Sequence, residues 1–147
     1  YILMGSDGIA HPDGVTDPKR PFFDRAVFKL MRFLLVPVRD NEFSAKYLYE
    51  SVNDKDWSIV RPGDLFDKDD DDAEIYGPTA KDDDGDYEIR DRPAESLFGG
   101  GSIARSDVAR FMTKLATMPS KDFQTVYNHK MPVIYQRTPA AEEEKKV

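Results

Sequence analysis

Two short apolar runs, each closed by glycine, limit what this chain can fold into. The first is residues 1–4, closed by Gly5, and the second is residues 57–60, closed by Arg61-Pro62-Gly63. Short apolar runs bounded by turn residues are typical of strands buried in a parallel sheet. Because a strand needs neighbours for its backbone groups, a chain that opens inside one is expected to be truncated upstream.

Helical patterns lie between these two runs. Apolar residues recur at helical spacing over residues 22–34, and Pro37 is expected to end that helix. A second helix follows, with Asp40 or Asn41 as its N-cap. Packing of the 22–34 helix against the sheet is the default expectation for its apolar face.

The later part of the chain continues this alternation. Residues 87–89 predict a short strand, and residues 102–105 lead into a helix capped by Ser106. Residues 123–127 predict a late strand. The order of strand, helices, strand, helix and strand predicts an α/β fold with a parallel sheet and flanking helices.

The negative charge is concentrated in one segment. The chain has a net charge of −7, and residues 64–91 contain 13 acidic and 3 basic residues. This composition cannot bury enough apolar surface to order itself, so residues 64–86 are expected to form a flexible acidic insertion. The domain is then expected to span residues 1–137, with a disordered charged tail at 138–147.

Composition excludes several classes of function. An acidic balance argues against nucleic-acid binding, and the absence of cysteine excludes disulfides and thiolate zinc sites. Cysteine usage fits the cytoplasm or another reducing compartment. No apolar stretch is long enough to span a bilayer, and Lys29 and Arg32 are too few for a membrane-surface helix. The run Asp67-x-Asp69-x-Asp71 lacks the later positions of a calcium loop, so no metal site is expected.

Several segments together resemble the C-terminal half of an atypical short-chain dehydrogenase/reductase, of the NmrA-like and biliverdin-IXβ/flavin reductase groups. The matching pieces, in chain order, are Met4-Gly5-Ser6, Asp56-Trp57, Ser58-Ile59-Val60-Arg61-Pro62-Gly63, Asp64-Leu65, Tyr87-Glu88-Ile89 and Ile103-Ala104-Arg105-Ser106-Asp107-Val108-Ala109-Arg110-Phe111-Met112. The resemblance implies an incomplete Rossmann-type parallel sheet, the C-terminal half of a doubly wound fold.

The chain departs from that family in two respects. It lacks a Gly-rich phosphate-binding turn near its start, and Gly99-Gly100-Gly101 follows no strong strand. None of the seven tyrosines has lysine four residues later, so the Tyr-x-x-x-Lys proton-transfer pair is absent. The resemblance therefore implies NAD(P)H as cofactor of a complete protein, with no tight binding and little turnover by this chain alone.

The resemblance also places candidate site residues at the carboxyl ends of the two apolar strands, where ligands bind in α/β folds. Ser6 is expected beside the nicotinamide and substrate, and His11 in the following loop is a candidate proton donor, although a solvated loop histidine is the more ordinary interpretation. The expected cofactor-contacting residues are Ser6, Pro62, Gly63, Asp64 and Leu65.

The resemblance implies a reductase that transfers hydride to a small-molecule acceptor, which is a small carbonyl, flavin-like or quinone-like compound. One alternative is a non-enzymatic NmrA-like regulator that senses the dinucleotide and contacts a protein partner through the acidic segment. Another is an assembly module that completes its sheet against another chain. The sequence leaves the substrate and the preference for NAD or NADP open.

Overall fold

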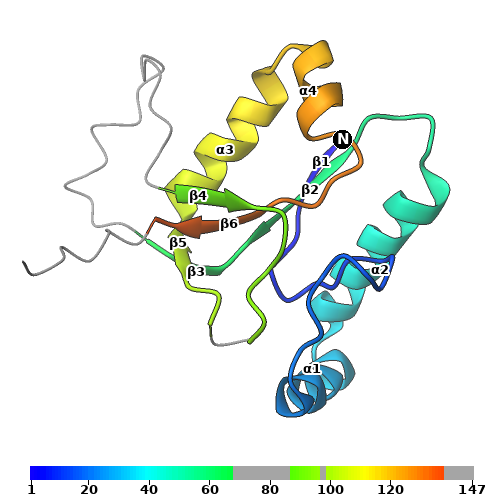
Figure 1. Cartoon of the computed structure of the whole chain (residues 1–147), viewed down its shortest axis with the longest axis vertical. Coiled ribbons are helices and arrows are strands. Elements are labelled where there is room, and N and C mark those ends of the chain that lie inside the picture. Colours follow the sequence, from blue (N-terminus) through cyan, green and yellow to red (C-terminus); the bar gives the residue numbers. More distant parts are fainter. Residues whose placement is uncertain (68–86, 97–98, 138–147) are drawn as a thin grey trace, which may run out of the picture.

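A four-stranded sheet in the order β1-β2-β6-β4 forms the centre of the α/β fold (Figure 1). The computed structural model describes residues 1–67, 87–96 and 99–137. β1 pairs with β2, and β2 with β6, in parallel, whereas β4 pairs with β6 in the antiparallel direction. The strands of this sheet are β1 (Ile2–Met4), β2 (Ser58–Pro62), β4 (Tyr87–Arg90) and β6 (Val133–Gln136).

Alternating side chains of β2 reach two separate apolar clusters, as the two-residue period of a strand requires. Val60 belongs to a cluster with Phe111 and Ile134, and Ile59 belongs to a cluster with Trp57 and Met131. All six of these side chains are buried. Both faces of β2 are therefore covered, which explains why its sequence is a continuous apolar run.

Helices cover the two faces. α3 (Arg105–Thr117) and α4 (Ser120–Val126) supply Val108, Phe111, Leu115 and Phe123 to the Val60 cluster. α2 (Val36–Ser51) packs Ala45 and Leu48 against the Ile59 cluster on the other face. Figure 1 shows α3 and α4 on one side of the sheet and α2 on the other, so the described residues form three layers.

Two short strands form a separate parallel pair beside the main sheet. They are β3 (Asp64–Phe66) and β5 (Ser102–Ala104), with Leu65 opposite Ile103. The expected acidic loop was therefore placed too early in the chain, because residues 64–66 pair with β5. The rest of that insertion, residues 68–86, and the expected tail at residues 138–147 lie outside the described residues.

The strand predicted at residues 123–127 is wrong, because these residues lie in or directly after α4. Phe123 is buried, and the ring of Tyr127 lies 5.7 Å from that of Phe111. Helical spacing puts residues 123 and 127 on one face, and their packing on α3 overrides the strand propensity of the segment. The last strand within the described residues is β6, at Val133–Gln136.

Two predicted helix caps are also wrong. α2 begins at Val36 with Pro37 in its first turn, so Asp40 and Asn41 lie inside the helix. Proline has no backbone N–H and is tolerated in a first turn, which allows α2 to start directly after the preceding helix. α3 begins at Arg105, so Ser106 is a helical residue rather than the N-cap.

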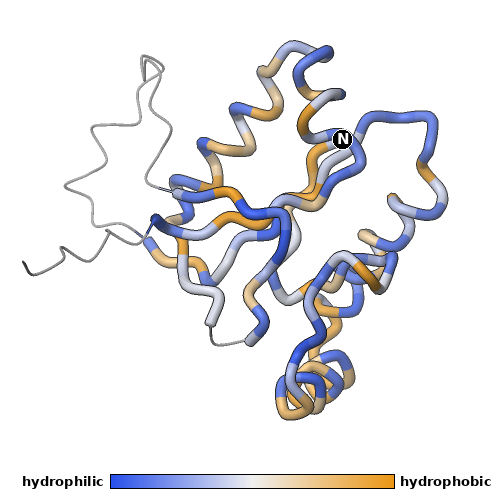
Figure 2. The backbone as a smooth tube through the Cα atoms, viewed as in Figure 1, coloured by the Kyte–Doolittle hydropathy of each residue, from blue (hydrophilic) through white to orange (hydrophobic). Residues whose placement is uncertain are grey.

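α1 (Phe22–Leu34) is the main departure from expectation, because it does not bury its apolar face against the sheet. Asp24 is its one buried residue, whereas Phe22 is 79% and Phe33 is 84% exposed. Figure 2 shows hydrophobic positions of α1 at the lower end of the molecule, beyond the sheet. The apolar period correctly predicted the helix but not what its apolar face contacts.

Two phenylalanines test this arrangement. Phe111→Ala is expected to lower the free energy of unfolding by about 3–5 kcal/mol, because it opens a cavity in the core. Phe33→Ala removes the same atoms from an exposed site and is expected to cost no more than about 0.5 kcal/mol. Urea unfolding followed by circular dichroism measures both. Equal losses would show that Phe33 is packed in the monomer.

Candidate active site

The carboxyl ends of β1 and β2 lie side by side and form the candidate site. Met4 is opposite Val60 in the parallel register. The backbone N–H of Gly5 donates to the carbonyl of Val60 at 2.8 Å, and that of Asp7 donates to the carbonyl of Pro62 at 2.9 Å. The loop after β1 therefore stays hydrogen-bonded to β2 beyond the last residue of the strand.

β6 brings Tyr135 to the same edge. The N–H of Gly63 donates to the carbonyl of Ile134 at 3.1 Å, which continues the β2–β6 pairing. The Tyr135 hydroxyl donates to Asp7 Oδ2 at 3.0 Å and accepts a hydrogen bond from the N–H of Ala94 at 3.3 Å. Tyr135 thus joins the loops that follow β1 and β4 at the end of β2.

Close packing around Tyr135 explains two glycines of the site. A Cβ atom on Gly63 would lie 2.4 Å from the Gly101 carbonyl oxygen and 2.7 Å from the Tyr135 ring. A Cβ atom on Gly100 would lie 2.6 Å from Asp7 Oδ2 and 2.9 Å from the Tyr135 hydroxyl oxygen. Both contacts are shorter than van der Waals packing allows, so the backbone approaches this edge only where there is no side chain.

Burial favours the protonated forms of Asp7 and Tyr135. Burial raises the pKa of Asp7 above its ordinary value and the nearby charge of Asp64 adds to the rise, although the Tyr135 hydrogen bond and Arg20 oppose it. Burial raises the pKa of Tyr135 to about 12, and the charge of Asp7 acts in the same direction. A carboxyl whose pKa is raised is a candidate for proton transfer.

Arg61 lies beneath this edge with no exposed surface. Its Nη1 atom donates to Asp17 Oδ2 at 2.7 Å and to the Ile9 carbonyl at 3.1 Å. Its Nε atom donates to the Met131 carbonyl at 2.9 Å. A single guanidinium therefore holds the loop after β1 and the segment before β6 against β2.

The structure brings together four of the six residues predicted from the sequence. Ser6 follows β1, Pro62 is the last residue of β2, and Gly63 comes directly after it, with Asp64 as the first residue of β3. The proximity of Asp64 to Asp7 is evident from its effect on the pKa of Asp7. These positions agree with the rule that the carboxyl ends of parallel strands meet, although no ligand contact follows from them.

The other two predicted residues are placed differently. The His11 Nδ1 atom lies 2.9 Å from Asp13 Oδ1, and the ring makes an edge-to-face contact with Tyr49 of α2, with ring centroids 5.4 Å apart. Leu65 lies in β3, opposite Ile103. His11 is therefore engaged with α2 rather than with the Asp7–Tyr135 pair.

Sequence reasoning missed Asp7, Tyr135 and the role of Arg61. Asp7 directly follows Ser6 and shares the strand-end signal that selected Ser6. Tyr135 ends the run Val133-Ile134-Tyr135, whose β-branched and aromatic residues favour a strand. No local pattern links residues 7 and 135, because only the β1-β2-β6 strand order brings them together.

Comparisons with solved structures support this description of the fold. The chuY protein of E. coli strain CFT073 matches with a TM-score of 0.55 and 22% identity, over 94% of this chain and 54% of that chain. The oxidoreductase ylbE of Lactococcus lactis matches with a TM-score of 0.52 and 16% identity, over 93% of this chain and 46% of that chain. The chain has part of a Rossmann-like α/β fold.

A third match is the short-chain dehydrogenase/reductase of Veillonella parvula DSM 2008 in complex with NADP. It has a TM-score of 0.47 and 16% identity, and it covers 92% of this chain and 49% of that chain. The chain spans about half the length of the solved structures that it matches. The sequence matches no protein-family model and no curated protein.

In residues 1–67, 87–96 and 99–137, no three histidine, aspartate or glutamate side chains are grouped as a metal site would require. Within the same residues, no helix is long and apolar enough to cross a membrane.

Substitution of Gly63 tests the close packing at the site. Gly63→Ala is expected to lower the free energy of unfolding by about 2–3 kcal/mol, because its methyl group meets a backbone carbonyl and the buried Tyr135 ring. Gly99→Ala is the control, since its Cβ atom would have no neighbour closer than 3.6 Å. Thermal and urea unfolding compare the two variants, and a Gly63→Ala protein as stable as the control would contradict the packing described here.

Asp7→Asn tests the raised carboxyl pKa. A group with a raised folded-state pKa stabilises the fold in its protonated form, and this contribution is lost as pH rises through the folded-state pKa. Asparagine stays neutral and keeps an acceptor for Tyr135. The variant is therefore expected to be more stable than wild type at pH 7, with a difference that shrinks toward pH 4. Urea unfolding from pH 4 to 7 measures it, and a difference that grows toward acid would give Asp7 the opposite shift.

Proposed function

We propose that this chain supplies the substrate side of an NAD(P)H-dependent reductase of the atypical short-chain dehydrogenase/reductase type. The observation that carries the proposal is the shared edge at which Ser6, Asp7 and the Pro62-Gly63 turn follow two adjacent parallel strands. Open α/β sheets bind their ligands at such an edge. The Rossmann-like fold of the chain supports the choice of a dinucleotide.

The residues present fit one end of the cofactor only. The Ser6 hydroxyl and the Pro62-Gly63 turn would border the nicotinamide, because they end the two central strands. The chain has no Gly-rich turn between a strand and a helix for the pyrophosphate. The phosphate-binding half of the complete protein would therefore come from other residues. When bound, the cofactor supplies the hydride, from C4 of its nicotinamide.

The proposed substrate is a small or flat carbonyl, flavin-like or quinone-like molecule. Reduction of such an acceptor also requires a proton and a group that orients the acceptor oxygen. The Ser6 hydroxyl is the proposed orienting donor, because it lies at the end of β1. The proposed proton reservoir is Asp7, whose pKa is raised and whose Oδ2 accepts the Tyr135 hydrogen bond. Tyr135 itself is 1% exposed, so it would position Asp7 rather than touch substrate.

A dinucleotide-sensing regulator is the second candidate. It is favoured by the absence of a Tyr-x-x-x-Lys pair and by the burial of Tyr135, the tyrosine that lies where the carboxyl ends of β1 and β2 meet. In this case NAD(P)H would bind without turnover, and the acidic residues 64–86 would be the docking surface for a protein partner. Turnover separates the two candidates.

The proposal makes a two-part prediction about dinucleotide binding. Isothermal titration of this chain with NADPH is expected to show no micromolar binding, because the pyrophosphate lacks its backbone donors. The coding DNA upstream of residue 1 is expected to encode, in frame, a strand followed by a Gly-rich turn. A micromolar dissociation constant for the chain alone, or upstream DNA without such a turn, would overturn the proposed role.

The longer polypeptide is then expected to oxidise NADPH, followed at 340 nm, with a panel of quinones and flavins. Ser6→Ala should lower kcat/KM about a hundredfold if the hydroxyl stabilises the developing oxygen charge. Ser51→Ala, at the exposed end of α2, is the matched control. NADPH binding without turnover on any acceptor would favour the regulator instead.

A further inference from the structure

An exposed apolar surface covers α1 and the first half of α2. We call it the α1–α2 surface. Phe22, Phe33 and Phe43 are 79%, 84% and 72% exposed, although all three are large and apolar. Contiguous exposed apolar surface of this kind marks a docking site on a protein or on a membrane. Its five most exposed apolar members are Phe22, Phe23, Phe33, Val36 and Phe43.

The contacts of α1 show that this surface faces away from the rest of the fold. Asp24 is buried, and Val27, Phe28 and Met31 are partly buried, which defines the inner side of the helix. Phe28 packs under Arg20, whose guanidinium carbon lies 4.4 Å from the ring centroid. The apolar residues of the α1–α2 surface occupy the remaining circumference, and Figure 1 shows α1 at the end of the molecule, beyond the sheet.

The charge of this region is opposite to that of the chain. Residues 19–47 contain seven basic and three acidic residues, whereas the whole chain has a net charge of −7. Two of the three acidic side chains add little free negative charge at the surface. Asp24 is buried, and Glu42 forms an ion pair with Arg32 at 2.7 Å. The exposed apolar residues are thus accompanied by an excess of cations.

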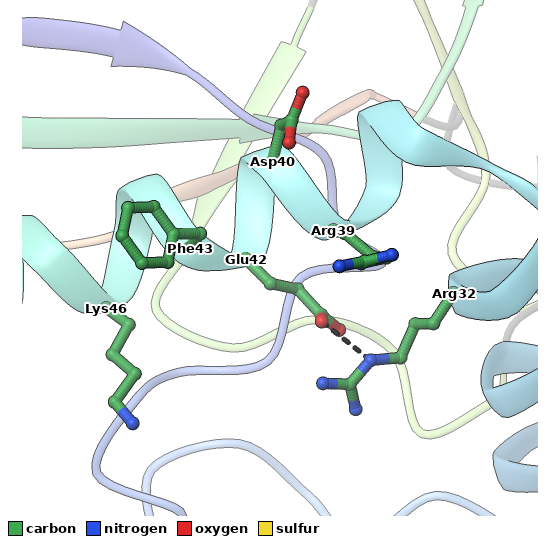
Figure 3. A pocket seen from close by; sticks show the side chains of 6 residues that line it. All are labelled: Arg32, Arg39, Asp40, Glu42, Phe43 and Lys46. Atoms are coloured by element: carbon green, nitrogen blue, oxygen red, sulfur yellow. Dashed lines mark ion pairs between the residues drawn. The ribbon is translucent and has the colours of Figure 1, made fainter.

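A hollow of about 380 Å³ lies between the two helices within this surface (Figure 3). Its cationic lining residues are Arg32, Arg39 and Lys46, with Phe43 beside them, and Asp40 and Glu42 also line it. Arg32 is paired with Glu42, and Lys46 lies 3.8 Å from Glu50 on the exposed side of α2. Figure 3 shows the Arg39 guanidinium near the Arg32–Glu42 ion pair, with Asp40 directed away from it. Positive side chains therefore lie next to apolar ones on this surface. At the surface of a bilayer, phosphate headgroups likewise lie next to acyl chains.

We propose that the α1–α2 surface docks on an anionic lipid bilayer. Phe33 and Leu34 enter the boundary between headgroups and acyl chains, and Arg39 and Lys46 meet the lipid phosphates. Helices that lie in the membrane plane combine an exposed apolar face with flanking lysine and arginine in this way. The inference goes beyond the proposed reductase function and reverses the sequence-based expectation, which counted Lys29 and Arg32 alone because α2 was not known to lie beside α1.

Vesicle flotation with the whole chain tests the proposal. Binding is expected to vesicles of phosphatidylcholine and phosphatidylserine in a 3:1 ratio, but not to phosphatidylcholine alone. Arg39→Gln and Lys46→Gln should each weaken binding about fivefold, since each basic residue near an anionic surface contributes roughly 1 kcal/mol. Lys121→Gln, at an exposed position of α4, is the charge control and should bind as wild type does. Addition of inorganic phosphate at millimolar concentration should leave binding unchanged.

A second pair of variants tests the apolar part of the surface. Phe33→Ser should reduce flotation at least fivefold, whereas Val15→Ser, in a loop where Val15 is 83% exposed, should not. No binding to anionic vesicles, or binding insensitive to Phe33→Ser, would overturn the proposal. So would competition by free phosphate, which would identify a simple anion site. A dimer on size-exclusion chromatography that Phe33→Ser converts to monomer, without vesicle binding, would assign the surface to a second copy instead.

Discussion

The buried guanidinium of Arg61 is the interaction on which the arrangement of the strand ends depends. A buried charge is tolerated only when it is paired and its donors are satisfied. Arg61 meets this requirement through the Asp17 carboxylate and the carbonyls of Ile9 and Met131, in two segments far apart in the sequence. Loss of any one partner would leave a charge or a donor unsatisfied in the core, so the loop after β1 and the start of β6 are fixed together.

This constraint explains how a Gly- and Pro-rich loop can hold a defined site. The backbone N–H of Asp7 donates to the Pro62 carbonyl, and the Asp7 carbonyl accepts a hydrogen bond from Arg20 at 2.7 Å. Arg61 holds the Ile9 carbonyl and the Asp17 carboxylate. With these contacts at Asp7, Ile9 and Asp17, the loop presents the Asp7 side chain to Tyr135. The pKa of the carboxyl is therefore set by a rigid environment rather than by an exposed loop.

The sequence predicted the parts of the fold that depend on local patterns. The apolar runs correctly located β1 and β2, and the rule for parallel strands then brought Ser6 to the same edge as Pro62 and Gly63. β5 and β6 are three and four residues long, too short for a period to identify them, and they exist because partner strands lie beside them. Likewise, the period of residues 22–34 identified a helical face but carried no information about its contacts, which tertiary structure alone decides.

The two edges of the main sheet differ in a way that bears on the proposed reductase. β4 closes one edge as an antiparallel strand, and its Tyr87 is buried. β1 forms the other edge, and β2 is its only strand partner within the described residues. A strand at the edge of a sheet presents unpaired N–H and C=O groups, with which a further strand can pair. The proposed dinucleotide-binding half would extend the sheet at β1, so that its strands and β2 would share the edge at which Ser6 lies.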